Sequence, residues 1–174
     1  MREQDTHHVV LIGTMGVGKT TIGRRLAERL GLRFTDSDEQ LFEMVGMNAQ
    51  RYAAEHGVPA LHDAEVEALM QALSRPPSVI AAAASVADSP SVLATLAISR
   101  ARVVVLEAPP EVTWERITGS RHRRDVTRED LARLATRREG NLRDVRAVDV
   151  LDTSLFGVEQ IVDRLTRVLS DRPI

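Results

Sequence analysis

The segment GTMGVGKTT, residues 13 to 21, constrains the fold of this 174-residue chain more than any other. It fits the pattern G-x-x-x-x-G-K-[ST], in which glycines turn backbone N–H groups towards a phosphate and the next helix directs its positive end at the same anion. The chain has 23 Lys+Arg residues, and Lys19 is its one lysine. A compact ammonium follows β- and γ-phosphates better than a planar guanidinium does, and a hydroxyl at Thr20 suits Mg²⁺. The pattern predicts an ATP–Mg²⁺ site formed by Gly13, Met15, Gly16, Val17, Gly18, Lys19, Thr20 and Thr21.

The residues on either side of this segment favour a phosphate loop over a chance match in a glycine-containing turn. Residues 8–12, HVVLI, form a short apolar run of the kind that makes a buried parallel strand. After the loop, Ile22, Leu26 and Leu30 recur at every fourth position and predict one apolar helix face, with Gly31 as its end. The expected unit is therefore strand, phosphate loop and helix.

The overall composition is that of one soluble globular domain covering residues 1–174, with residues 1–7 as a flexible tail. The net charge is −2, with 28% charged residues, which does not favour a nucleic-acid partner. The absence of cysteine excludes disulfides and thiolate metal sites. We see no signal peptide and no apolar run long enough for a membrane span, so we expect a cytoplasmic protein without a membrane partner. We also expect a monomer.

Strand-like and helix-like patterns alternate along the chain. Further strands are expected at residues 32–35, 78–83, 102–106 and 147–151. Further helices are expected at about residues 39–45, 48–56, 60–73, 91–99, 110–118, 128–139 and 158–169. This alternation predicts a three-layer α/β fold in which helices flank a five-stranded parallel sheet.

Two carboxylates follow the second expected strand in the segment FTDSD, residues 34–38. Ligands of such sheets bind at the carboxyl ends of the strands, so Asp36 and Asp38 are expected to face the phosphate loop. One of them would hold Mg²⁺ through water, and the other would accept a proton from an attacking hydroxyl. The alternative is a helix N-cap, for which aspartate is an ordinary residue.

A basic segment, RHRR at residues 121–124, follows Gly119 and Ser120. A mobile arginine that closes over the transferring phosphoryl group would stabilise its charge, so residues 120–126 are expected to form a lid. A solvated basic loop is the alternative. Nucleic-acid binding is disfavoured because no aromatic residues are interleaved for base stacking.

The stretches GTMGVGKTTIGRRLAERLG and FTDSDEQLFEMVG, with the spacing of the later segments, resemble the shikimate kinase family over residues 8–169. The resemblance implies a phosphate-loop fold of the nucleoside-monophosphate-kinase type that phosphorylates a small hydroxylated acceptor. It also implies that Lys19 and Thr20 bind ATP–Mg²⁺, that Asp36 lies on the metal side, and that Asp38 contacts the hydroxyls of the acceptor.

The same resemblance implies roles for several arginines. Arg116 falls at the arginine that stacks on adenine, and Arg123 falls at the lid arginine, although a shift of one residue would select Arg124. Arg138, in TRREGNL, falls at the arginine that binds the carboxylate of the acceptor.

Three departures from the family pattern fall in the acceptor half of the chain. His62 replaces the arginine of an F-R-x-x-E segment, while its glutamate is kept as Glu65. Histidine lacks the permanent charge and the bidentate fork of a guanidinium. Residues 83–85, Ala-Ala-Ser, replace a triple glycine, and residues 138–142, REGNL, replace R-x-P-L-Y. Each added Cβ takes space from the acceptor pocket.

Together these features predict ATP-dependent phosphoryl transfer to a hydroxyl of a small metabolite by a shikimate-kinase-like enzyme. The expected catalytic residues are Lys19, Asp36, Asp38 and Arg123. The expected acceptor-binding residues are Asp38, His62, Glu65, Ala83, Ala84 and Arg138. Two alternatives stay open: the same fold acting on a different polyol or cyclitol, and a non-catalytic ATP-binding regulatory module.

Overall fold

The computed structural model describes residues 7–118, 127–142, 147 and 149–171. Its strands form one five-stranded parallel sheet in the order β2-β3-β1-β4-β5. The strands are β1 (Val9–Gly13), β2 (Arg33–Asp36), β3 (Ser78–Ala81), β4 (Arg102–Glu107) and β5 (Asp149–Asp152). The predicted five-stranded parallel sheet is confirmed.

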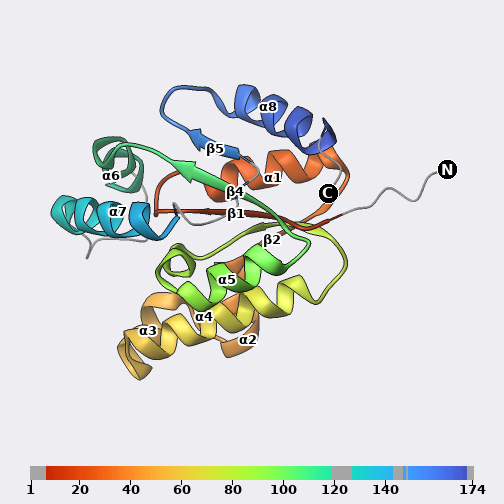
Figure 1. The fold of residues 1–174 in the computed structure, drawn as a ribbon. Coiled ribbons are helices and arrows are strands. Elements are labelled where there is room, and N and C mark those ends of the chain that lie inside the picture. Colours follow the sequence, from red (N-terminus) through yellow and green to blue (C-terminus); the bar gives the residue numbers. More distant parts are fainter. Residues whose placement is uncertain (1–6, 119–126, 143–146, 148, 172–174) are drawn as a thin grey trace.

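Helices connect the strands and lie on both sides of the sheet (Figure 1). They are α1 (Lys19–Leu30), α2 (Ser37–Val45), α3 (Ala49–His56), α4 (Val58–Leu73), the 3₁₀ helix η1 (Ala84–Asp88), α5 (Pro90–Ile98), α6 (Pro110–Thr118), α7 (Arg128–Leu142) and α8 (Val158–Asp171). The helix η1 was not predicted, and the third strand ends at Ala81 rather than at Ala83. The alanine run of residues 81–84 contains no turn residue or change of pattern that would mark this boundary.

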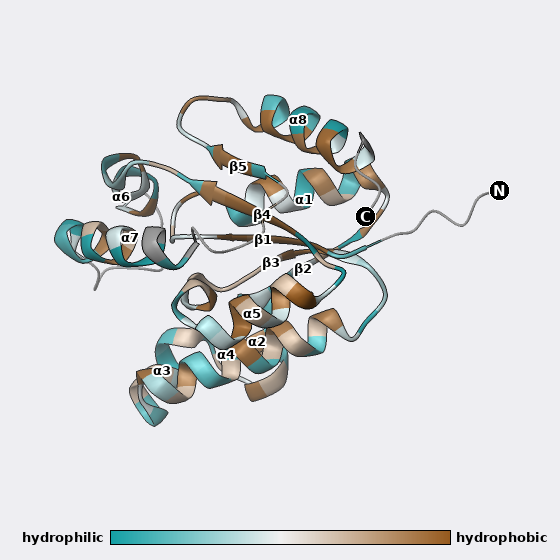
Figure 2. Cartoon of the chain, viewed as in Figure 1, coloured by the Kyte–Doolittle hydropathy of each residue, from teal (hydrophilic) through white to brown (hydrophobic). Residues whose placement is uncertain are grey.

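Alternate side chains of the central strand enter two separate cores. Val10 and Ile12 pack in one core with residues of α4, η1 and α5, whereas Leu11 packs in the other with residues of α1 and α8. The three inner strands β1, β3 and β4 are therefore largely apolar on both faces, as Figure 2 shows, and read as nearly unbroken hydrophobic runs in the sequence. This arrangement is the predicted three-layer fold.

The strand order brings three chain segments to one edge of the sheet. β1 lies between β3 and β4, so the segments after β1 and β3 leave the sheet side by side, and a backbone bond from Ala82 N–H to the Leu11 carbonyl, 3.0 Å long, joins them. Asp36, at the end of β2, is in register with Ala81 of β3. In open α/β sheets, ligands bind at the carboxyl ends of the strands, at the point where the strand order reverses.

Two predicted segments lie outside the described residues, at least in part. The tail predicted at residues 1–7 is described only at His7, and the lid predicted at residues 120–126 falls within the stretch 119–126 that the structure leaves out. Within the described ranges, no helix combines the length and apolarity required to cross a lipid bilayer.

Candidate active site

The phosphate loop connects β1 to α1, and at Gly13 and Gly16 its backbone lies too close to neighbouring elements for any other residue. Gly13 has a φ of 149°, and a Cβ built on it would lie 2.2 Å from the Leu106 carbonyl oxygen of β4. Gly16 has a φ of 82°, and its Cβ would lie 2.9 Å from the Thr113 carbonyl oxygen of α6. Other residues would be strained and crowded there, so these two glycines hold the loop close to β4 and α6.

The side chain of Lys19, the first residue of α1, crosses back over this loop. Its Nζ donates hydrogen bonds to the carbonyl oxygens of Gly13 and Thr14, at 2.9 and 3.0 Å. The ammonium therefore lies beside the backbone N–H groups at the start of α1, where the helix dipole also favours an anion.

Thr20 and Asp36, the two residues predicted to hold Mg²⁺, are in direct contact. The Thr20 hydroxyl donates to Asp36 Oδ2 at 2.8 Å, and the carboxylate is only 8% exposed. The other oxygen of Asp36 accepts from the backbone N–H of Asp38 at 3.0 Å and caps α2. The helix-cap interpretation is therefore correct, and the same carboxylate contacts Thr20 of the phosphate loop.

This pair suits Mg²⁺ better than a cation held by protein ligands alone. Among the described residues, no group of three or more histidine, cysteine, aspartate or glutamate side chains could hold a metal ion. Mg²⁺ in phosphoryl-transfer sites is bound by one or two oxygen ligands of the protein, by water and by the phosphates of the substrate. A hydroxyl beside a single buried carboxylate fits that chemistry.

The predicted acceptor residues gather around Glu65, on α4. Glu65 is 8% exposed and accepts a hydrogen bond from the Ser85 hydroxyl of η1. Burial raises the pKa of the Glu65 carboxyl above its usual value, against the opposing effects of the Ser85 bond and of His62. Asp38 raises the pKa further and Arg138 lowers it, so these groups lie close enough to interact electrostatically. The structure therefore brings Asp38, His62, Glu65 and Arg138 together, and adds Ser85.

Arg138 itself is bound to a carboxylate that the sequence did not predict as a site residue. Its Nε and Nη2 both donate to Asp88 Oδ2, at 3.1 and 2.7 Å, and Arg137 donates from Nε to Asp88 Oδ1 at 3.2 Å. Burial disfavours the charged form of Asp88, but its hydrogen bonds to Arg138 and then Arg137 outweigh that effect and hold its pKa below the usual value. In the sequence, Asp88 could be recognised only as an acidic residue in the segment that follows the third strand.

The alanines that replace the triple glycine adopt an unstrained backbone. Ala83 has a φ of −56°, and no residue other than glycine in the described ranges has a positive φ. The backbone at this position therefore does not require glycine in this chain. Ala83 is buried and Ala84 begins η1, so their methyl groups fill space at the end of β3.

Arg116, on α6, lies against the loop after β5. Its Nη1 donates to the Thr153 hydroxyl and its Nη2 to the Thr153 carbonyl, both at 2.9 Å, and Nη1 also reaches the Gly16 carbonyl at 3.4 Å. Thr153 was not predicted, because only the fold brings it next to α6. Arg123 and its alternative Arg124 lie outside the described residues.

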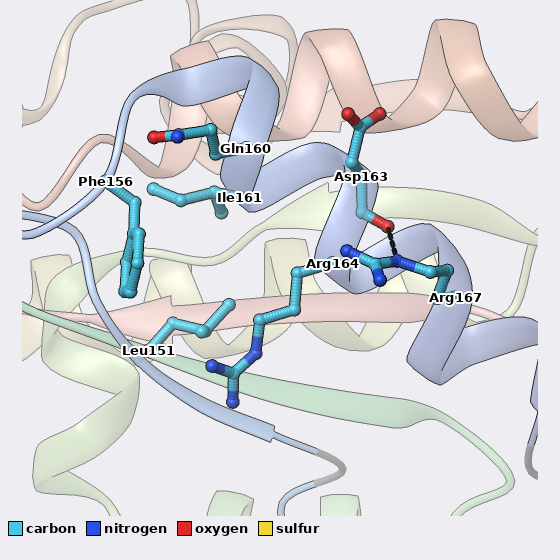
Figure 3. Close-up of a pocket in the computed structure, with 7 residues that line it drawn as sticks. All are labelled: Leu151, Phe156, Gln160, Ile161, Asp163, Arg164 and Arg167. Carbon is cyan, nitrogen blue, oxygen red and sulfur yellow. Dashed lines mark hydrogen bonds between the residues drawn. The ribbon is translucent and has the colours of Figure 1, made fainter.

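A pocket of about 300 Å³ lies between β5 and α8 (Figure 3). None of the predicted site residues is among those that line it, which are Leu151, Phe156, Gln160, Ile161, Asp163, Arg164 and Arg167. Arg164 donates from Nε to Oδ2 and from Nη2 to Oδ1 of Asp149, both at 2.9 Å, and so forms another arginine–aspartate pair, away from the phosphate loop.

Comparison with known proteins identifies the family of this chain. Residues 15–170 match the family model described as shikimate kinase. The shikimate kinase of Geobacter sulfurreducens is 33% identical over 165 residues, covering 92% of this chain and 90% of that protein. The chain belongs to the shikimate kinase family. The family's fold and its small-molecule kinase character, both predicted from the sequence, are thereby confirmed.

Other relatives match to different extents. The shikimate kinase of Caulobacter vibrioides is 44% identical over 73 residues, which is 42% of this chain but only 36% of that protein's length. Among solved structures, a shikimate kinase from Acinetobacter baumannii in complex with shikimate has a TM-score of 0.87 at 27% identity, covering 98% of this chain and 97% of that one. A gluconokinase from Sinorhizobium meliloti, with a TM-score of 0.69 at 20% identity, shares the fold.

Proposed function

We propose that this protein transfers the γ-phosphoryl group of ATP to a hydroxyl of a small polyhydroxylated metabolite. The observation that carries the proposal is the turn at the end of β2. There Asp36 contacts Thr20 of the phosphate loop at 2.8 Å, while Asp38, two residues later, interacts with the Glu65 cluster. One short segment thus joins the donor half of the site to the acceptor half.

Each half has a distinct part in the reaction. Lys19 and the backbone N–H groups of the phosphate loop bind the phosphates, while Thr20 and Asp36 would hold Mg²⁺, which when bound neutralises phosphate charge. Asp38 orients the acceptor hydroxyl and accepts its proton. Arg116 is proposed to stack on adenine. Arg123, or Arg124 one residue later, is the proposed lid arginine that stabilises charge during transfer.

The residues that depart from the family pattern lie in the acceptor half, so they affect which acceptor the protein phosphorylates. Relatives are named shikimate kinases, and one solved relative contains shikimate, so shikimate is the reference acceptor. His62 favours a second candidate, a different polyol or cyclitol, because a guanidinium that would bind a carboxylate is replaced by an imidazole. A monomer in the cytoplasm, where ATP is abundant, is the expected setting.

The direct test is an assay of phosphoryl transfer across a metabolite panel. Purified protein is incubated with ATP, Mg²⁺ and cyclic or linear polyols with and without a carboxylate, and phosphorylated products are identified by mass spectrometry. We expect at least one acceptor with a Michaelis constant below about 1 mM. ATP binding without transfer to any member of the panel would instead support a non-catalytic ATP-binding module.

A further inference from the structure

The pairing of Arg138 with Asp88 bears on which acceptor the site takes. We propose that Asp88 is a built-in carboxylate that occupies Arg138 and makes the site selective for acceptors without a carboxylate. The proposal rests on the function proposed above and names the chemical class of its acceptor. Such an acceptor is a neutral polyol or cyclitol, or the amide of a hydroxylated acid.

The geometry of the pair is that of a guanidinium bound to an acid. Nε and Nη2 of Arg138 both donate to Oδ2 of Asp88, at 3.1 and 2.7 Å, within the range of charge-assisted hydrogen bonds. The Arg138 side chain is 7% exposed and that of Asp88 is 12% exposed. A ligand carboxylate that used the same edge of the guanidinium would have to displace Asp88.

The charges around Arg138 oppose a second carboxylate. Asp88 is held in its charged form by Arg138 and Arg137, since their hydrogen bonds and charges keep its pKa low in spite of burial. Arg137 is on the outside of this group, with 59% of its side chain exposed. On the inner side, Glu65 is buried and interacts with Asp38 and Arg138. A carboxylate brought next to Asp88 would meet like charge, whereas a hydroxyl or an amide N–H can donate to it.

The position of His62 adds a second, independent observation. His62 precedes Glu65 by three positions on α4, so the two side chains share one face of the helix, and the charge of His62 lowers the pKa of the Glu65 carboxyl. An imidazole offers neither permanent charge nor a planar fork for a carboxylate. Thus one of the two cationic positions is changed, and the other is already neutralised within the chain.

A purely structural role for Asp88 predicts different behaviour. Asp88 also joins α7 to η1, as does Asn141, whose Nδ2 donates to the Ala87 carbonyl at 3.0 Å. If docking of α7 were its whole role, Asp88→Asn would lower stability and weaken all acceptors alike. The two roles can be distinguished by comparing the affinities of two ligands that differ only at the carboxylate, because a purely structural role would change both affinities alike.

The experiment compares shikimate with its primary carboxamide, which has the same ring and hydroxyls but no charge. Dissociation constants are measured calorimetrically with Mg²⁺ and a non-hydrolysable ATP analogue bound. We expect the unmodified protein to bind the carboxamide at least as tightly as shikimate. Asp88→Asn should tighten shikimate binding at least tenfold and leave carboxamide binding within about twofold. The matched control is Asp149→Asn, which makes the same change in an Asp–Arg pair whose carboxylate side chain is 13% exposed.

Several results would overturn the proposal. One is that the unmodified protein binds shikimate ten times more tightly than the carboxamide, a comparison that needs no variant. Another is that Asp88→Asn, shown to be folded by thermal unfolding, leaves the ratio of the two dissociation constants unchanged. A third is that neither probe binds to the unmodified protein or to the variant. Binding of the ATP analogue is measured in the same titrations, so failure of the kinase assignment is distinguished from failure of this proposal.

Discussion

The donor half and the acceptor half of the site are built by different means. In the donor half, the loop between β1 and α1 presents backbone N–H groups, and it requires Gly13 and Gly16 for steric reasons. The proposed acceptor half is made of side chains from α2, α4, η1 and α7, at positions where the backbone has no positive φ. We therefore expect substitutions in the loop to affect the reaction as a whole, and substitutions among the acceptor side chains to affect the choice of acceptor.

The largest expected effect tests the donor half. Lys19→Ala should lower turnover more than about 10³-fold and sharply weaken ATP binding, because it removes the positive charge beside the phosphates. Turnover is measured by coupled ADP release, and ATP affinity by calorimetry. Lys19→Arg is the matched control, which keeps the charge but changes its shape, and it should retain more ATP affinity. Undiminished ATP binding by Lys19→Ala would refute the phosphate-loop assignment.

The next prediction compares Asp36 and Asp38, which lie in one turn of the chain but belong to different halves of the proposed site. Asp38→Asn should lower turnover about 10²–10⁴-fold, the range for loss of a general base, with little change in ATP affinity. Asp36→Asn should instead raise the Mg²⁺ concentration needed for half-maximal rate, since Asp36 contacts Thr20. Rates across a Mg²⁺ titration distinguish the two. Equal and mild effects would leave Asp36 as a helix cap alone.

The smallest effect concerns stability in the acceptor half. Burial raises the pKa of Glu65, so between the ordinary pKa, about 4.3, and the raised one the unfolded state binds fewer protons. The free energy of unfolding contributed by Glu65 therefore falls as pH rises through that interval. Because glutamine does not ionise, Glu65→Gln should not lose this part of the free energy of unfolding as pH rises.

Thermal unfolding from acid to neutral pH measures this effect. We expect Glu65→Gln to gain about 2–4 °C in Tm relative to the unmodified protein as pH rises, corresponding to about 1 kcal/mol. Glu43→Gln, at an exposed position of α2, is the control and should show no such trend. A constant difference in Tm at all pH values would show that the substitution acts through packing instead of ionisation.

Sequence patterns predicted the elements whose signals are local. The strand, loop and helix around Lys19 and the acids after β2 depend on residues close together in the chain, and steric rules limit what can stand there. The structure then brought Thr20 and Asp36, 16 positions apart, within hydrogen-bonding distance. The parallel sheet followed from the alternation of elements, although its strand order did not.

The features that the sequence did not reveal are contacts between residues far apart in the chain, or an element in a stretch without a distinctive pattern. Asp88 and Arg138 are 50 positions apart, and Arg116 and Thr153 are 37 apart, so neither contact has a periodic pattern to reveal it. The helix η1 lies in an alanine-rich stretch without capping side chains. Resemblance to a family showed which residues had changed, but not that Asp88 would take up the guanidinium of Arg138.

The position of Lys19 has a practical consequence for chemical probing. Because it is the one lysine of the chain, it carries the one side-chain amine available to acylating reagents. A lysine-specific protease likewise has a single bond to cut, between Lys19 and Thr20, in the first turn of α1. Since helical backbone must unwind before a protease can hydrolyse it, the rate at which the fragment of residues 1–19 is released reports the local opening of the segment that binds the phosphates.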